Sequence, residues 1–362
     1  MGNRSRALVI ALGVFFVGIA ALAKFYAYPT LAVAPADQVA HTVSVGTNAT
    51  IFSAAELKEK TGVDLESRRT VRGDVVAAEQ ISKALNRGVV VFDTAVVTDD
   101  SKDYEFPDDA TKTAELPLSF VQERVVLDAH TGEAVRWNPT DPNDKSGEYI
   151  TTTLEEADRL KPDPASEFFK GHEGLVLKFP FGTEKKTYQF WDSTTRKAWP
   201  IEFKEQTELF GLKVYRFEQV VPKTDIPQAR PLMVPGSLVD EPGRVSVEAQ
   251  RSYQNTRTLW IEPVTGAIIK GKEMQLATID YNGQPKATAT QVSIEYDEAT
   301  VKKNIDGARE NGRDEGGYQS KAAQLHLIGF WVPLIALIIG LLLLAVMAFF
   351  QFRPRARRSA AT

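Results

Sequence analysis

Cysteine is absent from this chain of 362 residues, and so are the short motifs that mark the common enzyme classes. Without a thiol, disulfides, thiolate metal ligands and cysteine nucleophiles are excluded. The chain also has no Gly-x-Ser-x-Gly elbow, no His-Glu-x-x-His pair and no glycine-rich nucleotide loop. Its four histidines are scattered. We therefore expect no catalytic residue, no metal and no cofactor, and a protein that is not an enzyme.

Acidic residues are missing from both ends of the chain, which carry only bases. These bases are Arg4, Arg6, Lys24, Arg353, Arg355, Arg357 and Arg358. The whole chain has 43 basic and 47 acidic residues, so removing these seven leaves 36 basic residues in the middle and a net charge there of about −11. This sign disfavours nucleic acid as a partner, because a phosphate backbone attracts the opposite charge.

The first apolar run lies near the N-terminus. It has no charge from Ala7 to Ala23 and is just long enough to span a hydrocarbon core of ~30 Å. We predict a cytoplasmic tail at 1–6 and a transmembrane helix at 7–25. Lys24 and Tyr26 are expected to anchor its end among the lipid headgroups, and Pro29 is expected to stop the helix.

A cleaved signal peptide is the alternative interpretation of this run. Ala32-Val33-Ala34 has the small-x-small spacing of a processing site. Pro35 would follow the cut, and its imide nitrogen makes a poor scissile bond. Retention of the segment as a signal anchor is therefore favoured.

The second apolar run is the stronger of the two. Leu327–Phe350 is 24 residues without a charge, and we predict a transmembrane helix at 325–351 followed by a basic tail at 352–362. Its expected interfacial anchors are Trp331, Arg353 and Arg355.

Both basic clusters lie on the outer flanks of the two runs. The positive-inside rule places such flanks in the cytoplasm, so both termini are predicted to be cytoplasmic. Two crossings then place residues 26–324 on the opposite side. The sequence predicts a two-pass protein of the cell membrane with one exported domain.

The middle of the chain indicates a mainly β fold with short helices, in a single large domain. β-branched and aromatic clusters alternate with turn residues at short intervals. The clearest predicted strands lie in Gly88–Val97, Gln122–Trp137, Leu175–Phe179, Thr187–Trp191, Leu212–Phe217 and Thr258–Thr278. Predicted helices are Ala54–Lys60, Leu154–Leu160 and Glu298–Arg309, and Gly312–Gly317 is expected to be a flexible stem.

Two segments of this body resemble each other. Val126–Gly132 and Trp260–Gly266 both place an acid before a turn that ends in Thr-Gly. The pattern predicts two β-hairpins, in which glycine tolerates a positive φ. A recurrent turn is favoured over a duplicated domain. We interpret Glu262, Pro263, Thr265 and Gly266 as structural residues of the second hairpin.

Two other patterns leave alternatives open. Twelve aromatic residues lie in the stretch from Phe168 to Phe217, and they indicate either a packed core, which is favoured, or the wall of a hydrophobic conduit. Asp141–Glu148 is rich in oxygen ligands, but Lys145 stands where a calcium loop needs an oxygen, which favours an ordinary solvated turn.

Two motifs carry a resemblance to a known family. Thr258–Leu276 resembles the signature of class B scavenger receptors, a strand with Glu-Pro-x-Thr-Gly before a second strand. Leu209–Phe217 resembles that family's Gly-x-x-x-Tyr-Arg-Phe element and precedes the signature in the same order. Its matching residues are Gly211, Tyr215, Arg216 and Phe217. The resemblance implies two terminal spans and a β-rich, scavenger-receptor-like ectodomain that encloses a lipid tunnel.

Taken whole, the chain is similar to an actinobacterial envelope family, often labelled porin PorA-like, that contains a domain of unknown function. The similarity implies a place in the cell envelope. A membrane pore is disfavoured, because two apolar helices already account for the anchoring.

Two main hypotheses of function follow. The first is a non-enzymatic protein that binds or conducts lipids, with membrane lipids and an envelope lipid or glycolipid as partners; the sequence names no lipid-binding residue. The second is a scaffold that docks envelope proteins. A porin-like envelope protein is a further and less favoured alternative.

Overall fold

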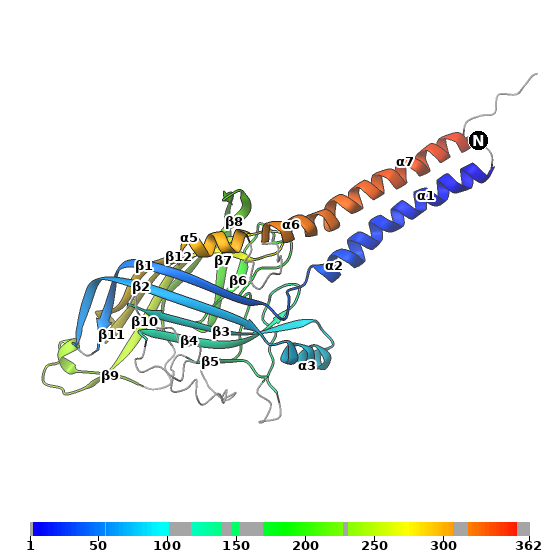
Figure 1. Ribbon diagram of the computed structural model, residues 1–362. Coiled ribbons are helices and arrows are strands. Elements are labelled where there is room, and N and C mark those ends of the chain that lie inside the picture. The colour runs from blue at the N-terminus through cyan, green and yellow to red at the C-terminus, as the bar shows by residue number, and fades with distance from the viewer. Residues whose placement is uncertain are drawn as a thin grey trace, which may run out of the picture. The chain divides into compact units, whose positions relative to one another are not determined.

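The computed structural model describes residues 3–54, 56–100, 117–139, 146–151, 169–226, 231–306 and 318–352. The chain forms two compact units. The first joins the two chain ends, Met1–Val33 and Ser320–Thr362, and the second is Ala34–Gln319. Figure 1 shows the elements of both units.

The first unit is a pair of long helical segments. The N-terminal segment consists of α1 (Asn3–Leu22), the π-helix η1 (Ala23–Ala27) and α2 (Tyr28–Leu31), and the C-terminal segment of α6 (Tyr318–His326), the π-helix η4 (Leu327–Trp331) and α7 (Val332–Phe352). Arg4–Leu31 and Ala322–Gln351 are each long and apolar enough to cross a membrane. The chain therefore has two candidate membrane helices, one near each end.

Prolines and glycines shape this helix pair. Pro333 has no N–H, which frees the carbonyl of Gly329 four residues earlier, and Lys24 Nζ donates to that carbonyl at 3.1 Å. Gly13 and Gly340 face each other, and a Cβ on Gly340 would lie 2.8 Å from the Gly13 carbonyl oxygen. The expectation that Pro29 stops the first helix is wrong, because helical geometry continues through Pro29 to Leu31.

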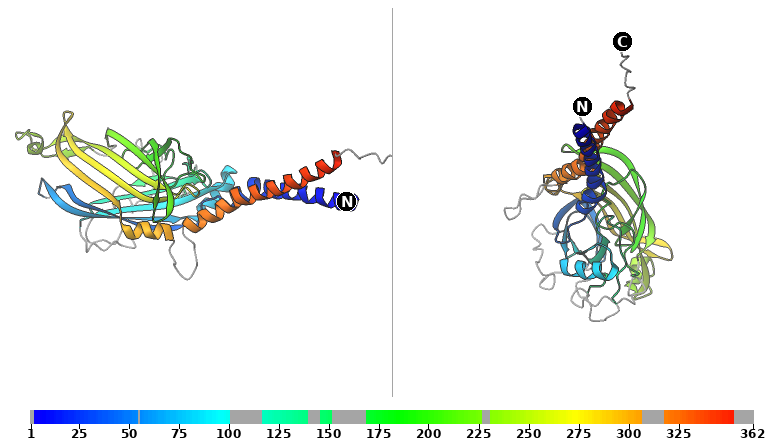
Figure 2. Two further views of the ribbon diagram at one scale, coloured as in Figure 1. Left: turned by 90° about the horizontal axis from the view of Figure 1, so that it is seen from above. Right: turned by 90° about the vertical axis from the view of Figure 1, so that its right-hand side faces the viewer.

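The second unit is built on one large antiparallel sheet. Its strands are β1 (Val39–Ser53), β2 (Lys58–Gly73), β3 (Val89–Asp99), β4 (Ser119–Asp128), β5 (Tyr149–Thr151), β6 (Tyr188–Asp192), β7 (Lys197–Leu209), β8 (Leu212–Asp225), β9 (Leu232–Val234), β10 (Val247–Ile261), β11 (Ile268–Tyr281) and β12 (Gln284–Tyr296). Eleven of them follow the order β5-β4-β3-β2-β1-β12-β11-β10-β8-β7-β6, and β9 pairs with β10. The strands curve around one inner face as a half-barrel (Figure 2), which confirms the predicted mainly β fold.

Single bridges join the two ends of this sheet at one point. Leu127 of β4 pairs with Ala134, Glu133 pairs with Leu175, and Leu175 pairs in parallel with Phe190 of β6. The Ala134 N–H donates to the Gly174 carbonyl at 2.7 Å. The irregular segments around 134 and 175 thus close a seam between β4 and β6 where regular strands do not meet.

The seam corrects two strand predictions. The strand predicted in Gln122–Trp137 ends at Asp128, and the residues after it make only isolated bridges. The same holds for Leu175–Phe179, of which only Leu175 is bridged in the described part of the chain. The other four predicted strands fall on β3, β6, β8 and the pair β10–β11.

The helix predictions had mixed outcomes. A helix at Ala54–Lys60 is wrong, because Ser53 ends β1 and Lys58 begins β2 in a hairpin. The Ser53 hydroxyl still accepts the Glu56 N–H, at 3.3 Å, but it supports a turn. The helix predicted from Glu298 is α5 (Glu298–Asp306). Residues Leu154–Leu160, Asp141–Lys145 and Gly312–Gly317 lie outside the described residues.

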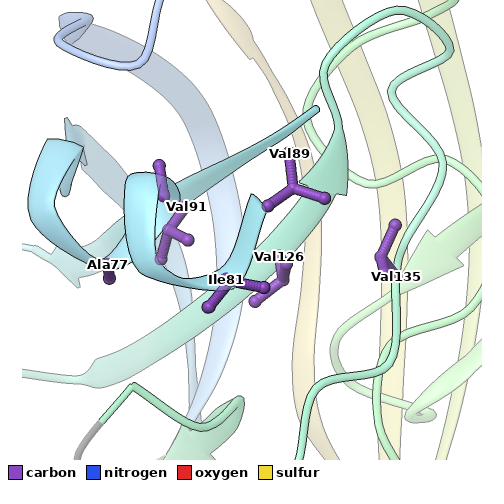
Figure 3. Close-up of a cluster of buried hydrophobic side chains, with 7 residues drawn as sticks. Ala77, Ile81, Val89, Val91, Val126 and Val135 are labelled. Carbon is purple, nitrogen blue, oxygen red and sulfur yellow. The ribbon is translucent and has the colours of Figure 1, made fainter. Parts of the chain in front are cut away.

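Helix α3 (Val75–Leu85) was not predicted, although its ends carry ordinary signals. The Asp74 carboxylate caps it by accepting the Ala77 N–H at 2.9 Å, and Asn86 ends it in a left-handed conformation. Figure 3 shows the apolar cluster through which α3 packs on the outer face of the sheet. Its members are Ala77, Ala78, Ile81, Val89, Val91, Val126 and Val135.

Apolar clusters also fill both ends of the inner face. At the end that carries the turn between β10 and β11, here called the core end, three phenylalanines and four aliphatic residues form a cluster: Leu175, Phe179, Phe190, Ile201, Phe217, Leu259 and Ile261. At the opposite end, here called the hairpin end, the cluster is Val234, Val239, Val247, Ala249, Ile279 and Ala287, and it includes the 3₁₀ helix η3 (Gly236–Val239). Phe179, Phe190 and Phe217 therefore pack in a core, as the favoured interpretation of the aromatic stretch predicts.

Candidate functional site: the cavity of the half-barrel

A cavity of about 330 Å³ lies on the inner face of the sheet. This volume falls in the range of small-molecule sites. Arg251, Tyr253, Arg257 and Leu259 of β10 face it, and they share one side of the strand because side chains alternate. Apolar wall residues include Ile51, Leu65, Val121, Leu259, Val292 and Ile294, and polar or charged ones include Arg69, Glu123, Arg251, Arg257, Glu273 and Gln275. The cavity wall is thus mixed, with apolar side chains beside polar and ionised ones.

Arg257 of β10 lies in the most complete polar network of this wall. Its guanidinium donates to Asp192 Oδ2 at 3.1 Å, Glu273 Oε1 at 2.9 Å, Gln219 Oε1 at 2.6 Å and the Trp191 carbonyl at 3.2 Å. Asn255 and Gln275 donate to the second oxygen of Glu273 at 2.8 and 2.7 Å. One cation therefore ties together β6, β8, β10 and β11.

The titration of this network follows from its burial and its charges. Burial alone would raise the pKa of Glu273, but the charge of Arg257 outweighs burial and lowers that pKa to about 2. Burial disfavours the charged form of Arg257, yet Glu273 and Asp192 raise its pKa. Arg257 and Glu273 are therefore both ionised at neutral pH.

His172 is buried between two carboxylates, and its ring packs on Trp191. Its Nδ1 lies 2.8 Å from Glu148 Oε1 and its Nε2 lies 3.8 Å from Glu123 Oε1. Burial alone would lower the pKa of His172, but the two carboxylates raise it to about 9. Trp191 also donates to Glu123, at 3.2 Å. A charged His172 thus links the seam segment to Glu123 of β4.

Two further arginines face the cavity, Arg69 on β2 and Arg251 on β10. Among the described residues neither guanidinium has a hydrogen bond or an ion pair. The charge of Arg69 helps to lower the pKa of Glu273, so a carboxylate lies within its electrostatic reach. No charged group shifts the pKa of Arg251, which burial alone lowers. Of these two cations, Arg251 is therefore the one without a nearby negative charge among the described residues.

The outer face of the sheet is charged instead. Its ion pairs include Arg68–Glu66 at 2.6 Å, Lys204–Glu202 at 2.8 Å, Arg216–Glu205 at 2.7 Å and Lys270–Glu295 at 3.0 Å. A barrel embedded in lipid presents an apolar band on this face. The outer face of this half-barrel is that of a surface in contact with water.

The Glu-Pro-x-Thr-Gly residues lie in the turn between β10 and β11. The buried Glu262 carboxylate accepts the N–H of Val264 at 2.9 Å, the N–H of Thr265 at 2.7 Å and the Thr265 hydroxyl at 2.6 Å. Burial raises the pKa of Glu262. Gly266 has a φ of +74°. In this turn one carboxylate thus accepts three hydrogen bonds that water would otherwise accept.

The similar turn after β4 uses the same chemistry. Asp128 Oδ1 accepts the N–H of His130 at 2.9 Å and that of Thr131 at 2.7 Å, and Gly132 has a φ of +71°. Segment 178–183 lies against both turns. Its backbone N–H groups donate to His130 at 3.3 Å, to Gly266 at 2.7 Å, to Val264 at 3.0 Å and to Pro263 at 2.7 Å. The two similar turns thus hold one segment between them at the core end.

The remaining residues singled out in the sequence lie in separate places. Gly211 forms the turn between β7 and β8, Tyr215 packs on Phe203, Arg216 faces outward and Phe217 is buried in the core-end cluster. Lys24, Tyr26 and Trp331 lie on the candidate membrane helices, where Tyr26 and Trp331 are exposed. Arg353 and Arg355 lie outside the described residues.

Comparison with known proteins places the whole chain in one family. The match to the family Porin PorA covers residues 6–349. The chain belongs to the PorA porin family. This confirms the similarity of the sequence to the porin PorA-like envelope family and, because the family is one of porins, the expectation of a protein that is not an enzyme.

Two relatives show how distant the members of this family are. Porin PorA of Corynebacterium amycolatum is 22% identical over an alignment of 372 positions, which covers 83% of this chain and 89% of the relative. Porin PorA of Corynebacterium resistens is 25% identical over 234 aligned residues, 48% of this chain, and there the chain spans only about half of the relative, 54%.

The charged residues of the cavity wall of this PorA-family chain were missed in the sequence. Arg251, Arg257 and Glu273 stand at inward positions of strands that otherwise carry Tyr253 and Leu259 on that face. The signal was present as large charged residues in phase with apolar ones along a strand. Glu123, His172 and Glu148 gave no local signal, because the fold brings them together from separate segments.

Proposed function

We propose that this PorA-family chain is a membrane-anchored protein of the cell envelope that binds a lipid in the cavity of its half-barrel. The observation that supports it best is the cavity itself, whose wall includes the apolar cluster of Ile51, Leu65 and Val292 and which lies inside a sheet whose outer face is charged. Burying an acyl chain there would recover about 0.8 kcal/mol per CH₂. The protein would act by shielding that chain from water.

The length of the inner face also fits an acyl chain. Arg251 and Leu259 both face the cavity and are eight residues apart on β10, roughly 27 Å at ~3.4 Å per residue. One leaflet of a bilayer has a hydrocarbon depth of about 15 Å, half of the ~30 Å core. The wall is therefore longer than a chain that fits one leaflet.

Lipid retention by the full chain tests this proposal. The protein is extracted in a non-ionic detergent and its bound lipid is measured by native mass spectrometry. Replacing Ala277, which faces the cavity, by Phe should lower the lipid content severalfold. Leu276→Phe is the matched control, because its side chain points to the other face of β11. If the unchanged protein carries no lipid, or if both variants retain it equally, the proposal is wrong.

The proposal includes the orientation in the membrane. The basic flanks at Arg4 and Arg353 support cytoplasmic termini and an exported half-barrel. Because the chain has no cysteine, single cysteines report its sides cleanly. A membrane-impermeant maleimide added to intact cells should label Gln284→Cys, in the exposed β11–β12 turn, and should not label Ser359→Cys. The reverse pattern would contradict the orientation.

Conduction is the second candidate function. The relatives carry the name Porin PorA, and ionised side chains line the cavity of this chain. A channel would need several copies to line a path with their paired helices, since the outer face of the sheet does not suit lipid. Purified protein in a planar bilayer tests it: stepwise currents at defined copy number support conduction, and a silent bilayer excludes it.

A further inference from the structure

Arg251 faces the cavity with no counter-charge among the described residues. Its neighbours in the sheet are Tyr253 on the same face, Ile279 on β11 and Ile226, whose N–H donates to the Arg251 carbonyl, and none of them is charged at neutral pH. The side chain is accessible to water because it faces the cavity, while protein surrounds it on other sides and that partial burial lowers its pKa. Because Arg251 is exposed to the cavity and has no partner among the described residues, its guanidinium is available to an acid group of a ligand.

The other ionised residues of the wall have their charges balanced. Arg257 has Asp192 and Glu273, and Glu123 has His172. Arg69 lies within the field of Glu273. Only Arg251 lacks a compensating group in the part of the chain that the structure describes. The wall therefore has an excess positive charge at one known point.

This point lies at one end of the apolar wall. On one side of Arg251, Val247 and Ala249 join the cluster that fills the hairpin end. On the other side the same face of β10 continues with Tyr253. A ligand with its charge on Arg251 would thus have its apolar part directed away from the hairpin-end cluster and along the cavity.

We propose that the cavity takes an anionic amphiphile whose acid group pairs with Arg251 and whose hydrocarbon chain lies beyond Tyr253 against the apolar wall residues Ile51, Leu65 and Val292. This inference rests on the lipid-binding function proposed above and specifies the class of lipid. A guanidinium binds a carboxylate or a phosphate monoester through two parallel hydrogen bonds, which a neutral hydroxyl cannot match. Selection would come from Arg251 and the bulk of the affinity from the chain.

Two probes with the same tail separate the two proposals. Dodecyl phosphate and 1-dodecanol are titrated against the full chain, freed of co-purified lipid and held in a non-ionic detergent, and bound ligand is measured by native mass spectrometry. Charge-assisted hydrogen bonds contribute about 1.5–3 kcal/mol, so Arg251→Gln should weaken dodecyl phosphate about 10- to 100-fold and change dodecanol less than twofold. Arg251→Lys should fall between, because it keeps the charge and loses the paired geometry.

Arg68→Gln is the matched control, since it removes one arginine from the outer face and should leave both affinities unchanged. Equal binding of the two probes by the unchanged protein, or a loss caused by Arg69→Gln in place of Arg251→Gln, would overturn the role of Arg251 and leave lipid binding intact. Failure of both probes to bind would instead contradict the proposed function. Thermal unfolding of each variant shows that the comparison is made between folded proteins.

Discussion

Arg257 and Arg251 lie on the same face of the same strand, six residues apart, yet their surroundings are opposite. Arg257 donates four hydrogen bonds and pairs with two carboxylates. The Arg251 side chain has no such partner among the described residues. The charge of Arg257 is therefore balanced within the protein, whereas the charge of Arg251 faces the cavity without a counter-charge among the described residues.

This difference separates a structural charge from one available to a ligand. Removing one member of a buried ion pair is strongly destabilising, because it leaves the charge of the other member buried and unpaired. An uncompensated charge contributes nothing of this kind. The same residue type on one strand should therefore have opposite effects on stability and on binding.

The largest expected effect is on the paired side. Arg257→Met should lower the free energy of unfolding by about 3–5 kcal/mol, because Asp192 and Glu273 would remain buried without their cation. Chemical denaturation of the full chain in detergent, followed by tryptophan fluorescence, measures it. A loss below about 1 kcal/mol would mean that water replaces the guanidinium, and the distinction between the two regions would fail.

The free energy of unfolding should depend on pH through His172. The folded pKa of His172 is about 9, against an ordinary value of 6.5. Protonation is therefore favoured by folding, and the stabilisation, up to about 3 kcal/mol, is complete below pH 6.5 and is lost as pH rises through 9. The unfolding free energy should fall between pH 7 and pH 9.5. His172→Gln should remove this pH dependence; a dependence that persists in the variant would assign it to another group.

The turns at the core end could be predicted from sequence, and their purpose could not. Asp or Glu before Thr-Gly is a local pattern, since the carboxylate reaches N–H groups two and three residues ahead and glycine supplies the positive φ. What the two turns contact is not local. Segment 178–183 lies about fifty residues from one turn and eighty from the other, and only the folded sheet brings all three together.

Strand prediction shows the same limit. The apolar run of β3 was recognisable because both of its faces are covered along part of its length, which concentrates valine and phenylalanine. β2, β7 and β12 have one charged face and were missed. The start of β2 was even assigned to a predicted helix, because Ser53 can act as an N-cap and Gly62 follows as a stop. Tertiary pairing with β1 decides that segment.

The charged layer of the cavity was the least predictable part. Its residues come from β2, β4, β6, β10 and β11 and from the segment around His172. No spacing along the chain connects them, because sheet order and curvature set their distances. The two apolar terminal runs, in contrast, were read directly, since length and lack of charge are properties of the sequence itself.

Substitution of Gly266 tests how closely the turn between β10 and β11 packs on segment 178–183. Gly266→Ala should lower the free energy of unfolding by about 2–3 kcal/mol, because φ is +74° and the new Cβ would overlap the carbonyl of Phe179. Gly283→Ala is the control: its φ is +73° but nothing lies within 4 Å of the added Cβ, so it should cost about 1 kcal/mol. Equal losses would show that the contact with segment 178–183 adds no constraint.

The smallest expected effect on stability is at Arg251. Arg251→Met removes a cation that has no counter-charge among the described residues, so the free energy of unfolding of the lipid-free protein should change by less than about 0.5 kcal/mol or rise slightly. The same denaturation measurement used for Arg257→Met decides it, with both variants studied in one detergent and at one pH. A loss above about 1 kcal/mol would mean that Arg251 holds the fold together as Arg257 does, and the open end of β10 would then be structural as well.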